Sequence, residues 1–258
     1  MPKWRRWYKG VFVATLLLYG LLLASLVLPL LEYFSHRRAA HLHGRIRRHW
    51  CILACHSVGL RVRVTGTPNP GARFWVANHV SWLDVIALGA QQPLAFVAKQ
   101  EVAAWPVLGY LARRAGTLFV RRGDSSHNAG IIEQMAWRLR QGEHLLLFPE
   151  GTTTSGDRVL RFHSRLLSPA TLTHSDTQPI ALEYQGLARD FAPFVGEDEF
   201  VPHLLSMLDL DCIELRIHYC PLLETGLKRD ELARTSREYI VGALETEPTA
   251  FSLHRKLS

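Results

Sequence analysis

The chain has 258 residues, an apolar content of 48% and a formal net charge of +7. This length suits one domain with an appendage, and the charge suits an anionic partner. The basic residues gather around one apolar segment, with no recognition-helix or base-stacking motif, so a membrane surface is favoured over nucleic acid. The four cysteines lack the spacing of a disulfide or zinc framework, and we expect all of them to be reduced and buried.

The first element is an uncharged, apolar segment from Val11 to Leu31, long enough to cross a hydrocarbon core of about 30 Å. A single span places its more positive flank in the cytoplasm. Here both flanks are basic, which favours a segment that enters one leaflet and returns, with a bend near Gly20 or Pro29. A cleaved signal peptide is the alternative, disfavoured by the length of the apolar run. The flanking residues are Lys3, Arg5, Arg6 and Lys9 before it, and Arg37, Arg38, Arg45, Arg47 and Arg48 after it.

A second helix, lying on the membrane or against the first helix, is expected from Arg38 to Gly59. Strands then alternate with helices. The alternation predicts an α/β fold with a mostly parallel central sheet flanked by helices. We therefore expect membrane-anchoring helices over residues 1–59 and an α/β domain over residues 60–258. The expected strands are Arg61–Thr65, Phe74–Ala77, Ala95–Ala98, Thr117–Arg121, His144–Phe148, Pro179–Tyr184 and Ile213–Tyr219. The expected helices start near Ser81 and span Val102–Arg113, Ala129–Gln141 and Lys228–Leu244, with an irregular connection over Ala188–Pro202.

Polar side chains follow three of the predicted strands: His79 the second, Arg121 and Arg122 the fourth, and Glu150 the fifth. Because sites in such sheets lie beyond the carboxyl ends of the strands, these residues are the candidates for a functional site.

The sequence Asn78-His79-Val80-Ser81-Trp82-Leu83-Asp84 places a carboxylate five residues after a histidine. Such an aspartate can hold a neutral imidazole in one tautomer, ready to take a proton from a hydroxyl. The structural alternative is a capping box formed by Ser81 and Asp84 at a helix start, with Asn78 as a turn residue. Alone the pair is weak evidence, because the chain contains thirteen histidines.

The sequence Phe148-Pro149-Glu150-Gly151-Thr152 ends the fifth strand and also has two interpretations. Proline and glycine suit a simple turn with a solvated acid. In the functional interpretation, Glu150 contacts a substrate hydroxyl or orients an arginine, while amides from Gly151 onward form an anion-binding nest. A guanidinium at a neighbouring strand end can grip a phosphate.

Four ordered blocks resemble the glycerolipid acyltransferase family, and most closely its bacterial 1-acylglycerol-3-phosphate acyltransferase branch. They are Asn78-His79-x-Ser81-x-x-Asp84, Gly116-x-x-Phe119-x-x-Arg122, Phe148-Pro149-Glu150-Gly151-Thr152 and Gln178-Pro179-Ile180-Ala181-Leu182.

The resemblance implies acyl transfer from acyl-CoA or acyl-carrier protein to a lipid hydroxyl at the cytoplasmic face of the inner membrane. It implies that His79 is the base and Asp84 its partner, and that Arg122 and Glu150 help to bind the acceptor. The remaining motif positions expected to contact substrate are Asn78, Ser81, Gly116, Phe119, Gly151 and Thr152.

The chain departs from the family pattern in two places. Thr153 and Thr154 stand where relatives have a basic residue, and His163 stands where they often have lysine. The expected acceptor is 1-acylglycerol-3-phosphate, and the alternative is lyso-ornithine lipid or another lysolipid. No metal or cofactor is expected. Two other classes remain open: a thioesterase or lipase, disfavoured by the absence of a Gly-x-Ser-x-Gly motif, and a non-catalytic membrane-binding module.

Overall fold

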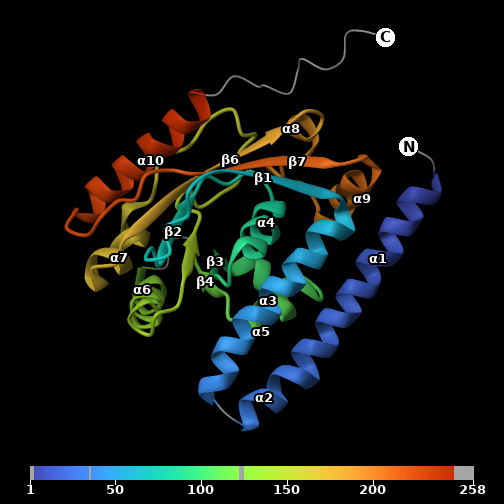
Figure 1. Ribbon diagram of the computed structural model, residues 1–258, viewed down its shortest axis with the longest axis horizontal. Coiled ribbons are helices and arrows are strands. Elements are labelled where there is room, and N and C mark those ends of the chain that lie inside the picture. The colour runs from blue at the N-terminus through green and yellow to red at the C-terminus, as the bar shows by residue number, and fades with distance from the viewer. Residues whose placement is uncertain (1–2, 35, 122–124, 247–258) are drawn as a thin grey trace.

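A seven-stranded sheet runs through the computed structural model, which describes residues 3–34, 36–121 and 125–246 (Figure 1). The strand order is β1-β7-β6-β2-β5-β3-β4. Strands β6, β2, β5, β3 and β4 run in one direction, while β7 is antiparallel to β6 and β1 is parallel to β7. The mostly parallel sheet is therefore confirmed. The strand bounds are β1 Leu60–Gly66, β2 Phe74–Ala77, β3 Ala95–Lys99, β4 Leu118–Val120, β5 Leu145–Leu147, β6 Thr177–Gln185 and β7 Ile213–Tyr219.

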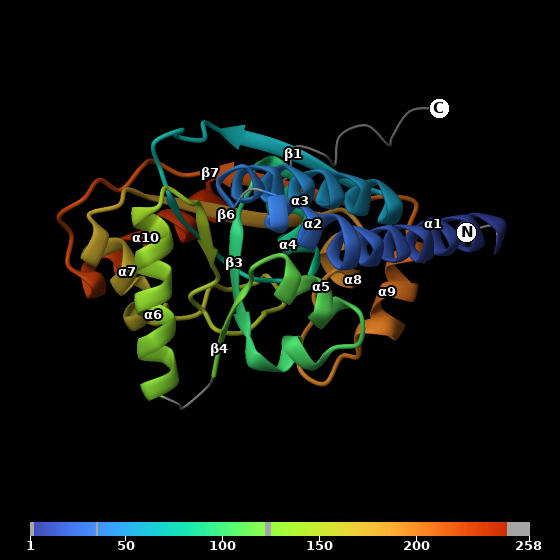
Figure 2. The ribbon, with the colours of Figure 1, turned by 90° about the horizontal axis from the view of Figure 1, so that it is seen from below.

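Helices cover both faces of the sheet, so the central strands are buried on each side (Figure 2). Along β2, Phe74 and Val76 pack into one hydrophobic cluster, while Trp75 and Ala77 pack into the other. This alternation follows from the two-residue period of a strand. One cluster takes side chains from α6 (Ser125–Arg140), α7 (Ser168–Thr173) and α10 (Arg229–Glu245). The other takes them from α3 (His36–Val58), α4 (Leu83–Gln91), α8 (Ala188–Phe191) and α9 (Phe200–Asp209).

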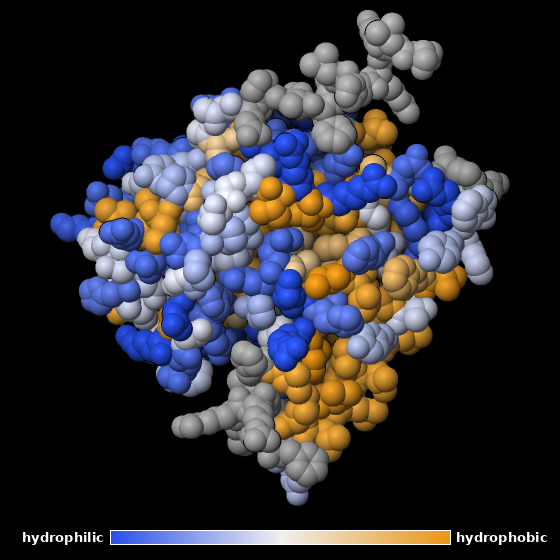
Figure 3. Space-filling model, in the orientation of Figure 1, coloured by the Kyte–Doolittle hydropathy of each residue, from blue (hydrophilic) through white to orange (hydrophobic). Residues whose placement is uncertain are grey.

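The N-terminal segment is a helical hairpin. It consists of α1 (Lys3–Leu22), a π-helical turn (Leu23–Val27) and α2 (Leu28–Phe34), after which α3 returns. The stretch Trp4–Leu31 is long and apolar enough to cross a membrane: an 18-residue window within it has a mean hydropathy of 2.6, and 22% of that window is buried. Figure 3 shows the resulting apolar surface at the lower right, where α1 and α2 lie in Figure 1. The helix continues through Gly20 and Pro29, and the irregular turn lies between them.

The two ends of this hairpin lie side by side against the α/β domain. Lys9 Nζ donates to the carbonyl of Val58, at the end of α3, at 3.2 Å and to that of Leu210, after α9, at 2.7 Å. Arg5 and Arg6 pair with Asp211 and Asp209 nearby. The hairpin therefore leaves the domain and comes back to it at one edge.

Three expectations from the sequence were wrong. The helix expected over Val102–Arg113 is a 3-10 turn (Gln100–Ala104) and a short α5 (Leu108–Arg114), because Pro106 disfavours a helical conformation at the residue before it. The region Ala188–Pro202 contains α8 and the start of α9, since Pro202 lies in the first turn, where its missing N–H is not needed. Cys212 is half-buried, whereas the other three cysteines are buried and all four are free thiols.

Candidate active site

His79, in the connection that follows β2, contacts Asp84, which lies in the first turn of α4. The imidazole Nδ1 lies 2.8 Å from Asp84 Oδ2. The carboxylate is fully buried, whereas 19% of the His79 side chain is exposed. Because an ionised carboxylate only accepts hydrogen bonds, Nδ1 carries the proton and Nε2 keeps its lone pair. The arrangement leaves one basic nitrogen on a ring whose other nitrogen is fixed.

Asp84 accepts further hydrogen bonds, which stabilise its buried carboxylate in place of water. Its Oδ2 accepts the backbone amides of Val80 at 2.8 Å and Ser81 at 2.9 Å. The amide of Ser81 completes one half of the capping box expected from the sequence, but α4 has no side-chain cap, so Ser81 does not supply the other half. The helix-capping and catalytic interpretations of Asp84 are therefore compatible, because Oδ2 accepts the Ser81 amide and also contacts the His79 imidazole.

Tyr184, on β6, donates its hydroxyl to Asp84 Oδ1 at 2.7 Å. Burial, reinforced by the neighbouring charge of Asp84, raises the pKa of Tyr184 well above its ordinary value. The phenol therefore stays protonated and remains a donor. No sequence motif identified Tyr184, although the two-residue period of β6 puts it on the same face as Leu182.

Glu150, after β5, uses both carboxylate oxygens to hold backbone. Its Oε1 accepts the amide of His79 at 2.9 Å, and its Oε2 accepts the amide of Leu160 at 2.7 Å. Burial raises the pKa of Glu150, and these two amides oppose that rise. Only 3% of the residue is exposed, so Glu150 is placed to orient His79 through its backbone amide and not to contact solvent.

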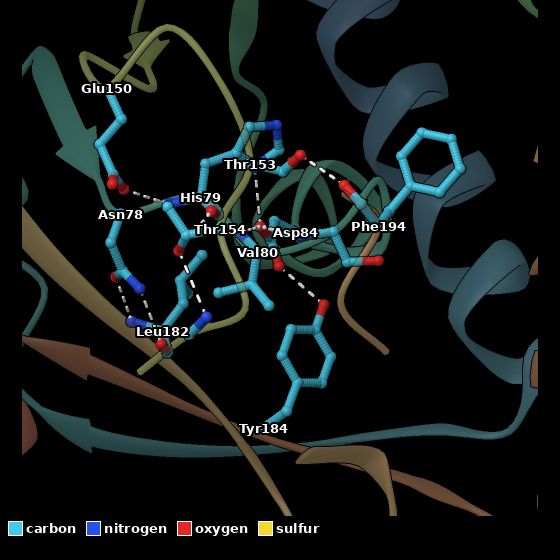
Figure 4. A network of polar contacts seen from close by, with 12 residues as sticks. Asn78, His79, Val80, Asp84, Glu150, Thr153, Thr154, Leu182, Tyr184 and Phe194 are labelled. Atoms are coloured by element: carbon cyan, nitrogen blue, oxygen red, sulfur yellow. Dashed lines mark hydrogen bonds and ion pairs between the residues drawn. The ribbon is translucent and has the colours of Figure 1, made fainter. Parts of the chain in front are cut away.

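Further contacts fix the His79 ring and its carbonyl. The ring stacks on Phe148, with centroids 3.9 Å apart and planes at 13°. The His79 carbonyl accepts the amide of Thr154 at 2.9 Å, and the Thr153 hydroxyl bonds the carbonyl of Phe194. Figure 4 shows these bonds around the histidine. The loop after Glu150 is thus tied to the connection after β2.

Asn78 lies beside this network, but its side chain is buried and bonds to β6 instead. Its side chain is 2% exposed and makes two hydrogen bonds with the backbone of Leu182, at 3.0 and 2.8 Å. The side chain therefore joins the start of the His79 connection to β6 (Figure 4).

Gly151 and Thr152 lie at the open side of the site. Gly151 has φ of +66°, and a Cβ there would approach His163 Cδ2 at 3.2 Å, so glycine is required. The Thr152 hydroxyl lies 3.4 Å from Lys99 Nζ. Lys99 ends β3, the strand beside β5. It belongs to no sequence motif, and its position at a strand end was the available signal.

Gly116 and Phe119, the motif positions of the second block that the structure describes, are not brought to His79. Strand β4 is the edge of the sheet, separated from β2 by β5 and β3. Gly116 precedes β4 at its amino end, where its carbonyl accepts Arg138, and the Phe119 carbonyl accepts His127. Arg121 is exposed at the carboxyl end of β4. Arg122 lies outside the described residues.

An apolar cavity of about 270 Å³ lies between the N-terminal hairpin and the domain. Trp82, three residues after the histidine, is one of its walls. Its lining also includes Leu16, Leu23, Trp50, Trp105 and Leu108. An imidazole base at the strand ends of an α/β sheet, close to such a cavity, fits an enzyme that activates a hydroxyl on an apolar substrate.

Comparison with known proteins agrees with this class. The model of the Acyltransferase family matches residues 61–183. The chain is 38% identical over 247 residues to the lyso-ornithine lipid O-acyltransferase of Pseudomonas aeruginosa, covering 95% of each protein. It is 36% identical over 133 residues to the 1-acyl-sn-glycerol-3-phosphate acyltransferase of Neisseria meningitidis, covering 52% of each.

The crystal structure of the 1-acyl-sn-glycerophosphate acyltransferase of Thermotoga maritima has a similar fold. Its TM-score is 0.65 at 18% identity, over 93% of this chain and 99% of that one. From these matches, the chain belongs to the acyltransferase family. It is an enzyme of lysolipid acylation, as the resemblance of its four motif blocks implied.

Proposed function

We propose that this enzyme transfers an acyl chain from acyl-CoA or acyl-carrier protein to the hydroxyl of a lysolipid, with His79 as the base. The observation that carries the proposal is the 2.8 Å contact between His79 Nδ1 and Asp84 Oδ2. It leaves Nε2 of a partly exposed ring free to accept a proton.

The reaction proceeds in one transfer without an enzyme-bound acyl group. Nε2 of His79 takes the proton of the acceptor hydroxyl as the oxygen attacks the thioester carbonyl. Asp84 stabilises the imidazolium that forms. Collapse of the tetrahedral intermediate breaks the carbon–sulfur bond, and the leaving thiolate takes the proton back from His79.

The oxyanion of that intermediate needs amide donors. The amides of Val80 and Ser81 already donate to Asp84. In the loop after Glu150, the amides of Thr152 and Thr153 donate to no acceptor among the described residues. We assign the oxyanion to these two amides.

Lyso-ornithine lipid is the acceptor that we favour. Its headgroup carries a carboxylate and an ammonium where lysophosphatidate carries a phosphate. Lys99 offers a cation beside Thr152, and Thr153 adds none at the position where relatives have a basic residue. Glu101, Arg113 and Arg121 line a shallow groove that begins at Gln100, the residue after Lys99, so a carboxylate for the ammonium is present together with cations. The Pseudomonas relative also matches more of the chain than the Neisseria relative.

The apolar cavity and the hairpin suit a lipid substrate at a membrane surface. We propose that the hairpin enters one leaflet of the inner membrane, with the domain on the cytoplasmic face where acyl donors are made. Its apolar surface (Figure 3) meets acyl chains.

The test is an acyl-transfer assay with purified enzyme, offering lyso-ornithine lipid and lysophosphatidate separately with each donor. We expect a higher kcat/KM for lyso-ornithine lipid, and Glu101→Gln should raise KM for that acceptor only, because lysophosphatidate has no ammonium. Product analysis distinguishes the classes: free fatty acid as the main product would identify a thioesterase, and no thioester turnover with any lysolipid would leave a membrane-binding module.

A further inference from the structure

The guanidinium of Arg237, on the C-terminal helix α10, donates hydrogen bonds to two backbone carbonyls. Its Nε donates to Leu160 at 3.0 Å and to Val159 at 3.1 Å, and its Nη2 donates to Val159 at 2.7 Å. In the part of the chain that the structure describes, no carboxylate pairs with it. The fork of an arginine suits two adjacent carbonyls, which the single ammonium of a lysine cannot bind in the same way.

These carbonyls belong to a segment with little local support. Residues 148–163, between β5 and the 3-10 turn Ser164–Leu167, form no helix or strand. Val159 and Phe162 belong to the same buried hydrophobic cluster as Leu232 and Ile240 of α10. Apolar packing therefore holds the segment against the helix, while its backbone direction depends on polar contacts.

The segment is linked to His79 by hydrogen bonds through Glu150. The amide of Leu160 donates to Glu150 Oε2 at 2.7 Å, and Glu150 Oε1 accepts the amide of His79 at 2.9 Å. The Val159 carbonyl, which Arg237 holds through Nε and Nη2, and the Leu160 amide belong to one planar peptide group, so Arg237 fixes the direction of the Leu160 N–H. Three residues thus connect α10 to the backbone of His79.

We propose that Arg237 is a positioning residue for the histidine, acting through Leu160 and Glu150. The inference rests on the proposed function, in which His79 is the base. It extends the functional residues to α10, which lies outside the stretch 61–183 matched by the family model.

The test compares Arg237→Gln with a matched control on the same helix. Arg234, nearly one turn earlier, is exposed and pairs only with Glu238, at 2.9 Å, among the described residues. Arg237→Gln should lower kcat by about tenfold to a hundredfold, the effect of a misplaced catalytic group, with KM within about twofold. Arg234→Gln should leave both unchanged, and Arg237→Lys should recover part of kcat. An unchanged kcat in Arg237→Gln would overturn the proposal.

Two further measurements separate positioning from general stability. In a Glu150→Gln background, Arg237→Gln should reduce kcat much less than in wild type, because the route passes through Glu150. Equal reductions in both backgrounds would overturn the route. Hydrogen exchange should accelerate in the peptide covering residues 159–163 in Arg237→Gln and not in Arg234→Gln; unaltered protection would also overturn it. If His79→Ala keeps its turnover, the proposed function fails, whereas the exchange result still tests the contact.

Discussion

Replacement of Tyr184 by phenylalanine removes the hydroxyl that holds one oxygen of the buried aspartate. Asp84 is fully buried, and Tyr184 is the partner of its Oδ1 at 2.7 Å. A hydrogen bond to a buried charged group contributes about 1.5–3 kcal/mol to stability. Tyr184→Phe should therefore destabilise the folded state by about 2 kcal/mol, which lowers Tm by about 4–8 °C for a domain of this size.

The effect of Tyr184→Phe on catalysis should be smaller than its effect on stability suggests. Oδ2, the oxygen that contacts His79, keeps the amides of Val80 and Ser81 at 2.8 and 2.9 Å. The imidazole therefore keeps its tautomer, and we expect kcat to fall by less than about tenfold. Asp84→Asn removes that acceptor charge, and the loss should approach about four orders of magnitude, as in a Ser-His-Asp triad.

The assay is initial-rate release of the donor thiol, with Tm measured by a scan in the same detergent. An unchanged Tm in Tyr184→Phe would refute the hydrogen bond. A kcat as low as that of Asp84→Asn would refute the argument that backbone amides, rather than the tyrosine, keep the aspartate in place.

Three other results are expected. His79→Ala should lose at least about a hundredfold in turnover while remaining folded, and near-wild-type turnover would contradict its role as base. Arg122→Ala should mainly raise KM for a phosphate-bearing acceptor, because a ground-state contact is lost; an unchanged KM for lysophosphatidate points away from that substrate. Reporters fused before Val11 and after Ser258 should both indicate the cytoplasm, since the start of α1 and the end of α3 lie together; a periplasmic domain would separate the enzyme from its acyl donor.

The sheet and the His–Asp pair were accessible from the sequence because each depends on local patterns. The bounds of β2 agree with the prediction, since four apolar residues stand between polar or turn-forming neighbours. The contact between His79 and Asp84 also follows from a spacing of five residues across a helix start. Strand ends then predicted that His79 and Glu150 would meet, and β2 and β5 are indeed adjacent.

The roles of individual polar residues were less accessible, because backbone groups distant in sequence determine them. Glu150 is engaged by the amide of Leu160, ten residues later, and no side-chain pattern reveals an amide. Asn78 resembles an exposed turn residue until β6 brings the backbone of Leu182 against it. The strand order was also beyond local patterns, and it determines that Gly116 and Phe119 lie at the edge of the sheet.

The position of β1 at the sheet edge has a consequence for the order of events during synthesis. Among the described residues, the edge strand β1 pairs with β7 alone, so Leu60 has no strand partner until Ile213 has been synthesised. At the ordinary translation rate of about 5–20 residues per second, that delay is about 8–30 s. The apolar hairpin leaves the ribosome first and can enter the lipid during this interval. The nascent chain would then be tethered at the bilayer before its last two sheet strands arrive, which keeps an unpaired strand edge near the membrane surface until β7 covers it.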